Sequence, residues 1–188
     1  MPPHFVTPAA TFVTLASLLL AATMEFHPAL GAGPETGKQV PPLKVFDATG
    51  LHAGGDADYA AERKGRPTIY IFVQASRWDR PTARFLRAVD ETLGNEAPEA
   101  YIVAVWLTDD VEKTRRYLPI AQQSLQLSRT ALTCYTANKD GPKDWQLDLA
   151  AAVSVVVAAQ GKVAETLDYR SVNETLAPEV AAALKKAL

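Results

Sequence analysis

The stretch "PTIYIFVQASRWDRPTARFLRAVDETLG", from Pro67 to Gly94, decides the fold. Its first nine residues, 67–75, are rich in β-branched and aromatic side chains, the pattern of a strand that is covered on both faces. A short polar turn follows, and Pro81 then stands in the first turn of a helix, where proline is tolerated. Gly94 is expected just past the end of this helix. One helical stripe carries its apolar residues, Phe85, Leu86, Val89 and Leu93.

The same alternation continues along the chain. Residues 100–107, "AYIVAVWL", predict a second buried strand. A helix is expected to open at Asp109 or Asp110, because carboxylates suit a helix N-terminus, and Pro119 should kink this helix or end its first segment. Residues 130–135, "TALTCY", predict a short strand. Strands separated by a helix imply right-handed parallel crossovers.

Further elements flank this unit. Residues 43–46, "LKVF", predict a strand that runs into a turn, in which Gly50 is free to take a positive φ. Residues 151–169 predict two strands joined by a tight turn at the dipeptide "QG", a hairpin that adds antiparallel strands to the sheet. Residues 171–188 close the chain as a helix. The order of elements predicts an α/β sandwich with a mixed central β-sheet.

Composition limits the possible functions. The chain has 188 residues, of which 48% are hydrophobic and 21% charged, so one domain with a sizeable core is expected. Its formal net charge is -2, and no cluster of lysine and arginine is interleaved with aromatic residues. The sequence therefore lacks the basic surface that nucleic-acid binding requires.

The N-terminal segment predicts export. Residues 11–23, "TFVTLASLLLAAT", are apolar and uncharged, and small residues follow at Ala29 and Gly31, which resembles a signal peptide and its cleavage site. Glu25 and His27 leave this run shorter than the ~20 residues of a membrane span, so we expect no stable span in the mature chain. The alternative is a disordered tail or a tail that tethers the protein to the membrane.

These observations divide the chain into three parts. We expect a signal peptide over residues 1–31, a linker rich in proline and glycine over 32–42, and one folded domain over 43–188. The protein is then periplasmic or extracellular. Cys134 is its single cysteine, so no internal disulfide can form and stability must come from the core.

Three motifs in this order resemble the thioredoxin-like superfamily, in particular its exported thiol-disulfide and peroxiredoxin-related branch. They are "GKQVPPLKVFDATG" (37–50), "KGRPTIYIFVQAS" (64–76) and "VSVVVAAQGKV" (153–163), and the resemblance covers Gly37 to Leu188. It implies a thioredoxin-like three-layer sandwich, in which helices flank the mixed central sheet.

The family's redox residues are absent from the positions that the resemblance assigns. The two cysteines of its Cys-x-x-Cys motif would fall at Trp78 and Pro81, and a peroxidase-like register with Ser76 as the hydroxyl residue puts Asp79 at the thiol position. The family's cis-proline, which presents backbone to a bound polypeptide, would fall at Val153, where we expect an ordinary trans bond. We therefore predict no thiol catalysis at the former active-site positions Trp78, Asp79, Arg80, Pro81 and Val153.

Other candidate chemistry is sparse. A thiol at a helix start is activated by backbone amides and the helix dipole, and here Asp79 would serve as a structural cap of that helix. Cys134 is flanked by apolar residues on a predicted strand, with Arg129 as the nearest cation in the sequence, so a buried, inert thiol is expected over a reactive one. His52 has no partner at zinc spacing. We predict no catalytic residue, metal or cofactor.

The turn "SRWDRP" has a second interpretation, as a binding surface. Arg77, Trp78 and Arg80 offer an aromatic face beside arginines, residue types that are enriched in binding hot spots. Alternatively, Trp78 folds back over the sheet edge as core and the charges are solvated. The preferred hypothesis is an exported binding or scaffold module with an unidentified protein partner. The alternatives are an oxidoreductase or peroxidase acting through Cys134 or a partner's cysteines, and a structural subunit of an envelope assembly.

Overall fold

The structure, a computed structural model, describes Met1 and residues 33–188. The predicted signal peptide therefore lies almost wholly outside the described residues. Within them, no helix is both long and apolar enough to cross a bilayer. The strands are β1 (Lys44–Asp47), β2 (Gly55–Asp58), β3 (Thr68–Gln74), β4 (Tyr101–Leu107), β5 (Thr130–Tyr135), β6 (Val153–Ala159) and β7 (Lys162–Tyr169). The α-helices are α1 (Tyr59–Arg63), α2 (Arg80–Glu96), α3 (Val111–Leu125) and α4 (Ala177–Ala187), and 3-10 turns form η1 (Ala75–Arg77), η2 (Lys143–Trp145) and η3 (Glu174–Leu176).

The strands form one mixed sheet in the order β2-β1-β5-β4-β3-β6-β7. The central strands β3, β4 and β5 are parallel, so their carboxyl ends lie side by side, with Gln74 opposite Leu107 and Leu107 opposite Tyr135. The outer strands pair antiparallel on both sides, and β6 and β7 form the expected hairpin. The predicted mixed sheet with parallel crossovers is confirmed.

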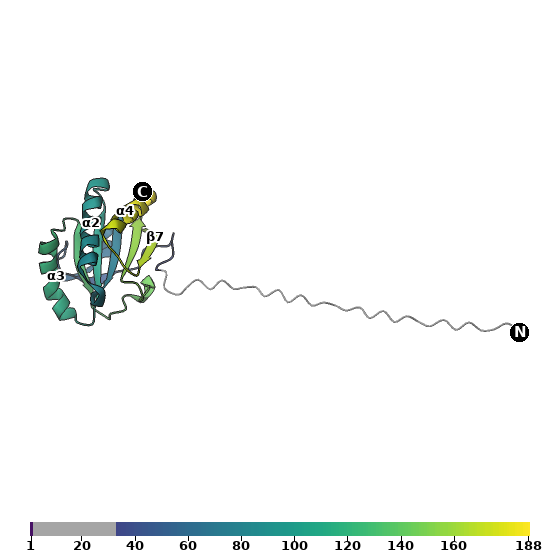
Figure 1. Cartoon of the computed structure of the whole chain (residues 1–188), viewed down its shortest axis with the longest axis horizontal. Helices are drawn as coiled ribbons and strands as arrows, with labels where there is room; N and C mark the ends of the chain where they lie inside the picture. The colour runs from purple at the N-terminus through teal and green to yellow at the C-terminus, as the bar shows by residue number, and fades with distance from the viewer. Residues whose placement is uncertain (2–32) are drawn as a thin grey trace.

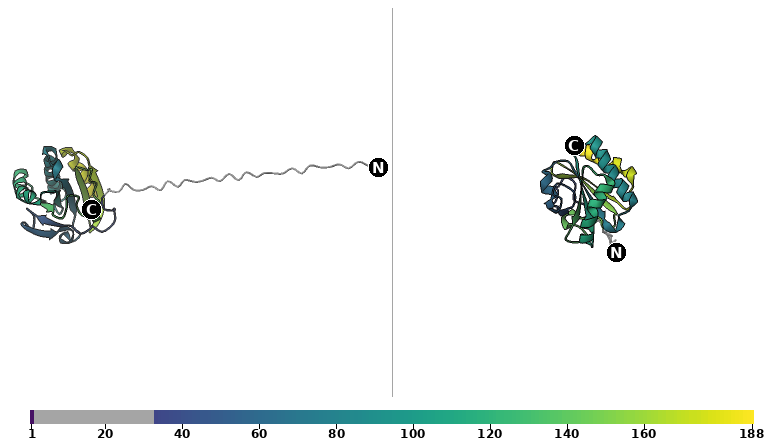
Figure 2. Two further views of the ribbon diagram at one scale, coloured as in Figure 1. Left: turned by 90° about the horizontal axis from the view of Figure 1, so that it is seen from below. Right: turned by 90° about the vertical axis from the view of Figure 1, so that its left-hand side faces the viewer.

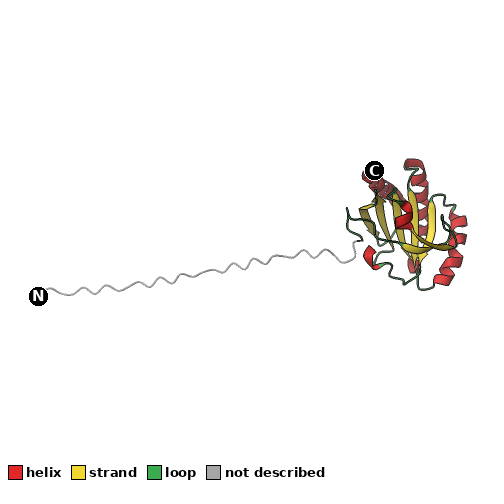
Figure 3. Ribbon diagram, turned by 180° about the vertical axis from the view of Figure 1, so that it is seen from behind, coloured by secondary structure: helices red, strands yellow, loops and turns green. Residues whose placement is uncertain are grey.

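Two apolar layers enclose the sheet. Helices α2, α3 and α4 cover one face, and the short α1, together with the loop that carries Trp145, covers the other. Figures 1 and 2 show the three long helices against the sheet, and Figure 3 shows the strands from behind. Because side chains on alternate positions of each central strand point to opposite faces, every residue of β4 from Ile102 to Leu107 is buried. The predicted three-layer sandwich is confirmed.

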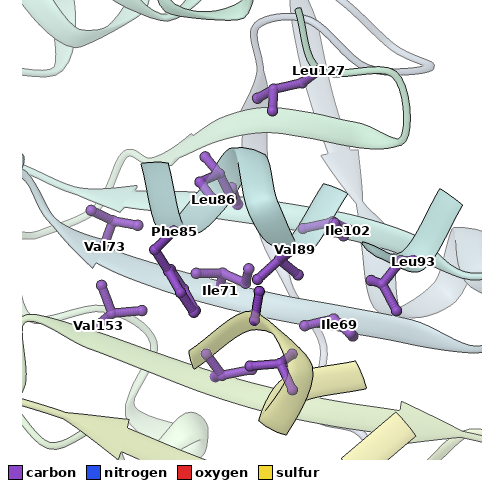
Figure 4. Packing of buried hydrophobic residues seen from close by; sticks show 14 of the residues in the cluster. Ile69, Ile71, Val73, Phe85, Leu86, Val89, Leu93, Ile102, Leu127 and Val153 are labelled. Atoms are coloured by element: carbon purple, nitrogen blue, oxygen red, sulfur yellow. The ribbon is translucent and has the colours of Figure 1, made fainter. Parts of the chain in front are cut away.

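Helix α2 is held by the apolar stripe that the sequence predicts. Phe85, Leu86, Val89 and Leu93 are each at most 1% exposed and lie over β3 (Figure 4). Burying a side chain of this size stabilises the fold by about 1.5–3 kcal/mol. The helix does not end before Gly94 as predicted, because the Ala97 amide still donates to the Leu93 carbonyl at 2.9 Å.

Two further local expectations are corrected, and one strand was missed. Gly50 does not take a positive φ; it is needed for close approach, since a Cβ there would lie 2.2 Å from the Tyr59 hydroxyl oxygen. Helix α3 continues through Pro119 to Leu125 as one element, so Pro119 does not end a first segment. Strand β2 was missed because its sequence "GDAD" is polar and glycine-containing and lacks the residues that strands favour.

The segment predicted as a linker is bonded to the domain. Amide and carbonyl groups of Gly37 and Lys38 exchange hydrogen bonds with Val163 of β7 at 2.8 and 2.9 Å, and the Val40 amide donates to the Gly161 carbonyl at 2.9 Å. These bonds lie along the outer edge of β7 and come from residues that precede the predicted domain start at residue 43. We call residues 33–40 the N-terminal strap.

Candidate functional site

The junction between β3 and α2 carries a carboxylate at the helix start. The Asp79 carboxylate accepts hydrogen bonds from the Thr82 amide at 2.9 Å and the Thr82 hydroxyl at 2.7 Å, as the helix cap that the sequence predicts. These two bonds, the hydroxyl bond first, lower the pKa of this exposed carboxyl below its ordinary value. A backbone amide at the start of α2, of the kind that would stabilise a thiolate in a redox protein, therefore already serves a carboxylate.

Trp78 immediately precedes this cap and is half-buried. Its ring packs edge-on against Trp106 of β4, with ring centroids 4.9 Å apart and an interplanar angle of 62°. Its indole Nε1–H donates to the Tyr117 hydroxyl of α3 at 2.7 Å. Both sequence interpretations of Trp78 therefore describe part of its environment, because one edge of the ring packs on the core and the ring also reaches the surface.

A pocket of about 500 Å³ opens beside this ring, between the carboxyl ends of β3 and β4 and the first two turns of α3. We call it the Trp78 pocket. Its apolar wall consists of Trp78 and Trp106, and Tyr117, which is bonded to Trp78, and Lys113 of α3 also line it. The crevice at the carboxyl ends of parallel strands is a frequent ligand site in α/β sheets, because the loops there diverge.

The charges around the Trp78 pocket are partly neutralised. Asp109 Oδ2 lies 3.8 Å from Nζ of Lys139, and Asp110 caps α3 by accepting a hydrogen bond from the Lys113 amide at 2.9 Å. The Lys113 ammonium forms no ion pair with any residue among 33–188. The pocket therefore combines an aromatic wall with one cation that has no carboxylate partner in the described part of the chain.

Beside the turn that joins β3 to α2, the backbone at the start of β6 is already hydrogen-bonded within the chain. The described residues contain no cis peptide bond, so Val153 follows the trans bond that we expected. The Ala152 carbonyl accepts from the Gln74 amide at 3.2 Å, and the Ala152 amide donates to the Tyr169 carbonyl at 2.8 Å. Arg77 Nη1 donates to the Ala150 carbonyl at 2.7 Å. The backbone that would meet a polypeptide in the resembled family is thus occupied within this chain.

The structure brings together only part of the predicted site. Trp78 lines the pocket, but Arg77 is directed to the loop before β6, and Arg80 is an exposed residue of the first turn of α2. Pro81 occupies the first turn of α2, as expected. Sequence reasoning missed Trp106, Tyr117 and Lys113. Their positions in the predicted elements could have identified them. Trp106 stands near the end of a buried parallel strand, and the other two lie one turn apart on the helix that follows.

Cys134 lies on β5 and is fully buried. Burial is the main cause that raises the pKa of its thiol, while the positive charge of Arg115 opposes that rise. The Arg115 guanidinium stacks over Phe46, the residue paired with Cys134 across the sheet, at 4.1 Å from the ring centroid. The cation that acts on this thiol is thus supplied by α3, whereas the sequence offered only Arg129. A buried thiol with a raised pKa is a poor nucleophile at neutral pH.

No metal centre is found among the described residues. They contain no group of three or more histidine, cysteine, aspartate or glutamate side chains that could hold an ion. His52 Nε2 lies 3.6 Å from Oε2 of Glu62 on the surface, which is a single pairwise contact.

Comparison with known proteins relates this arrangement to solved structures. No family model matches the chain, and no curated protein matches it. A thiol peroxidase from Chromobacterium violaceum superposes with a TM-score of 0.60 and 14% identity over 85% of this chain and 91% of that one. A domain of possible thiol-disulfide isomerase from Cytophaga hutchinsonii superposes with a TM-score of 0.55 and 17% identity, over 84% of this chain and 97% of that one. A secreted Mycobacterium tuberculosis disulfide oxidoreductase superposes with a TM-score of 0.50 and 14% identity, over 74% of this chain and 95% of that one. At these identities the likeness shows a shared fold.

Proposed function

From its thioredoxin-like fold, which lacks the paired cysteines, we propose that this chain is an exported binding or scaffold module whose ligand site is the Trp78 pocket. The observation that carries the proposal is the tryptophan itself. It stands where the resemblance places the first cysteine, and it walls a pocket of about 500 Å³ together with Trp106 and Tyr117. Concave sites of this size, with an apolar lining and a few polar groups, are typical of ligand binding.

The pocket is built on rigid elements. Trp106 is 2% exposed and lies in a central strand, and the Trp78 ring is fixed at two points, by its packing on Trp106 and by its hydrogen bond to Tyr117. A fixed wall loses little conformational entropy when a ligand binds, which favours affinity. An aromatic residue that is rigid and partly accessible is also the type that dominates binding energies.

Thiol catalysis is disfavoured by the same geometry. The family's chemistry needs a thiolate at the start of α2, where this chain has the Asp79 carboxylate bonded to Thr82. Cys134, the remaining thiol, is buried and has a raised pKa. Peptide binding in the manner of the resembled family is disfavoured too, because both backbone groups of Ala152 are bonded inside the sheet.

Export is part of the proposal. It is supported by the apolar N-terminal segment of the sequence and by the secreted M. tuberculosis oxidoreductase among the proteins that share the fold. A module with this placement would meet its partner outside the cytoplasm.

Affinity capture from the native envelope fraction tests the proposal. The immobilised domain is compared with Trp78→Ala, which removes the wall, and with Tyr117→Phe, which keeps the ring and removes the hydroxyl. Leu149→Ala is the matched control, because Leu149 is 49% exposed and lies outside the pocket. We expect a partner that is retained by the wild type and the control and lost by Trp78→Ala. Capture that is identical for all four proteins, with the fold of each confirmed by circular dichroism, would contradict the proposed site.

A further inference from the structure

The Trp78 pocket is lined by two carboxylates, Asp109 and Asp110, two ammonium groups, Lys113 and Lys139, and several neutral polar groups, among which the Tyr117 hydroxyl retains a free donor. The Trp78 indole N–H is already bonded to the Tyr117 hydroxyl oxygen, so this oxygen acts as an acceptor there and its own proton stays available. The structure shows no acceptor for that proton among residues 33–188. The pocket therefore presents a neutral O–H donor next to an aromatic wall.

The free positive charge lies beside this donor. Lys113 and Tyr117 are four residues apart on α3, so they are neighbours on one face of the helix, and both line the pocket. The two carboxylates nearby are engaged, Asp109 with the Lys139 ammonium at 3.8 Å and Asp110 with the Lys113 amide at 2.9 Å. An ammonium and a phenol on the same helix face suit a carboxylate, which can accept from both.

The aromatic side chains of the pocket suit a ring. Trp78 and Trp106 meet edge to face, a packing that a further aromatic group can extend. A volume of about 500 Å³ accommodates a group of one or two rings. The Tyr117 hydroxyl lies at the edge of the Trp78 ring, so a ligand that contacts both Trp78 and the donors of α3 has a ring at one end and an anion at the other.

We infer that the Trp78 pocket binds an aromatic carboxylate, with the ring against Trp78 and Trp106 and the carboxylate bonded to Lys113 and Tyr117. This inference rests on the proposed function, because it names the ligand chemistry of the same site. Such a group has two sources, a free small molecule and the carboxyl-terminal aromatic residue of a polypeptide.

A pair of probes that differ only in charge tests the inference. 3-Phenylpropionate and its neutral amide are titrated into the protein, and the indole N–H resonances of the chain's three tryptophans are followed by NMR. We expect the Trp78 resonance to shift and that of Trp145 to stay, because Trp145 is fully buried against Tyr70 and Phe72 on the other face of the sheet. The carboxylate should bind about tenfold more tightly than the amide, as one charge-assisted hydrogen bond provides.

Single substitutions separate the two contributions. Lys113→Gln should abolish the preference for the carboxylate and keep the binding of the amide, and Tyr117→Phe should reduce the preference. Lys186→Gln is the control, since Lys186 is an exposed lysine in the last turn of α4, outside the pocket. Because Lys113 is exposed, its replacement is not expected to disturb folding.

Peptides distinguish the two sources. A short peptide that ends in phenylalanine is compared with the same peptide amidated at its C-terminus. Binding of the free acid peptide at least as tight as that of 3-phenylpropionate assigns the site to polypeptide ends, whereas weaker binding assigns it to small molecules.

Two results would overturn the inference. Equal affinity for acid and amide, or a preference that survives Lys113→Gln, would exclude the carboxylate contact while leaving the pocket as a binding site. Absence of any shift with all probes would exclude an aromatic carboxylate altogether, and the capture experiment with Trp78→Ala would then decide separately whether the proposed function also fails.

Discussion

Replacing Asp79 by alanine should destabilise the domain by about 1 kcal/mol, within the 0.5–2 kcal/mol range of lost N-caps. The change removes the acceptor of two hydrogen bonds, from the Thr82 amide at 2.9 Å and the Thr82 hydroxyl at 2.7 Å. Thr82 is 3% exposed, so water replaces these bonds poorly. In a domain of this size, 1 kcal/mol lowers the melting temperature by about 2–4 °C, which scanning calorimetry resolves.

The loss should also depend on pH. Asp79 has a lowered pKa in the folded state, so its charge stabilises the fold fully above the unfolded-state pKa of about 3.9, and this stabilisation is lost as the pH falls through the lower folded value. The charge effect is small because the carboxyl is exposed and screened. The difference between wild type and Asp79→Ala should therefore be constant from pH 5 to 7 and shrink below about pH 4.

Asp79→Asn is the matched control. Asparagine caps helices about as well as aspartate, so it should keep most of the stability and lose the pH dependence. Equal melting temperatures for Asp79→Ala and wild type at pH 7 would refute the view that this carboxylate holds the start of α2. A difference that grows on acidification would refute the sign of the pKa shift.

Three further predictions concern the missing redox chemistry. The purified domain should neither reduce a disulfide substrate nor consume peroxide above a blank, and turnover that disappears in Cys134→Ser would contradict this. Native Cys134 should react slowly with iodoacetamide and rapidly after denaturation, since it is fully buried and its pKa is raised; fast native labelling would show an accessible thiolate. In a Cys134→Ser background, Trp78→Cys with Pro81→Cys should form a disulfide, and the first thiol should ionise below its reference pKa of about 8.5, further so with Asp79→Gly. Two thiols that titrate like free peptides and never bridge in a folded protein would show that the assigned register is wrong.

The sequence predicts most elements of this fold because their signals are local. The buried run before Trp78 and the apolar stripe from Phe85 to Leu93 define β3 and α2 without any knowledge of the partner elements. The same reasoning fails for a helix boundary that depends on backbone hydrogen bonds. Helix α2 does not end at Gly94, because its hydrogen bonding continues to Ala97. Gly50 was expected to provide a special backbone conformation, but the structure needs glycine there because a Cβ would not fit.

The candidate site was predictable only at Trp78. Its partners come from elsewhere in the chain, Trp106 from the next strand and Tyr117 from the helix after it, 39 residues from Trp78. Arg115 beside Cys134 was missed for the same reason. No spacing rule within one segment encodes such contacts, since they arise when parallel strands bring their carboxyl ends together.

The N-terminal strap has a practical consequence for anyone who shortens this protein. A truncation placed at Leu43, as the composition of the preceding residues suggests, would remove the partners of Val163 and leave backbone groups of β7 open along the rim of the sheet. Unpaired strand rims template pairing with other molecules. Recombinant protein that begins at Leu43 should therefore self-associate at concentrations where protein that begins at Gly33 stays monodisperse, even though both retain the entire helical layer and the Trp78 pocket.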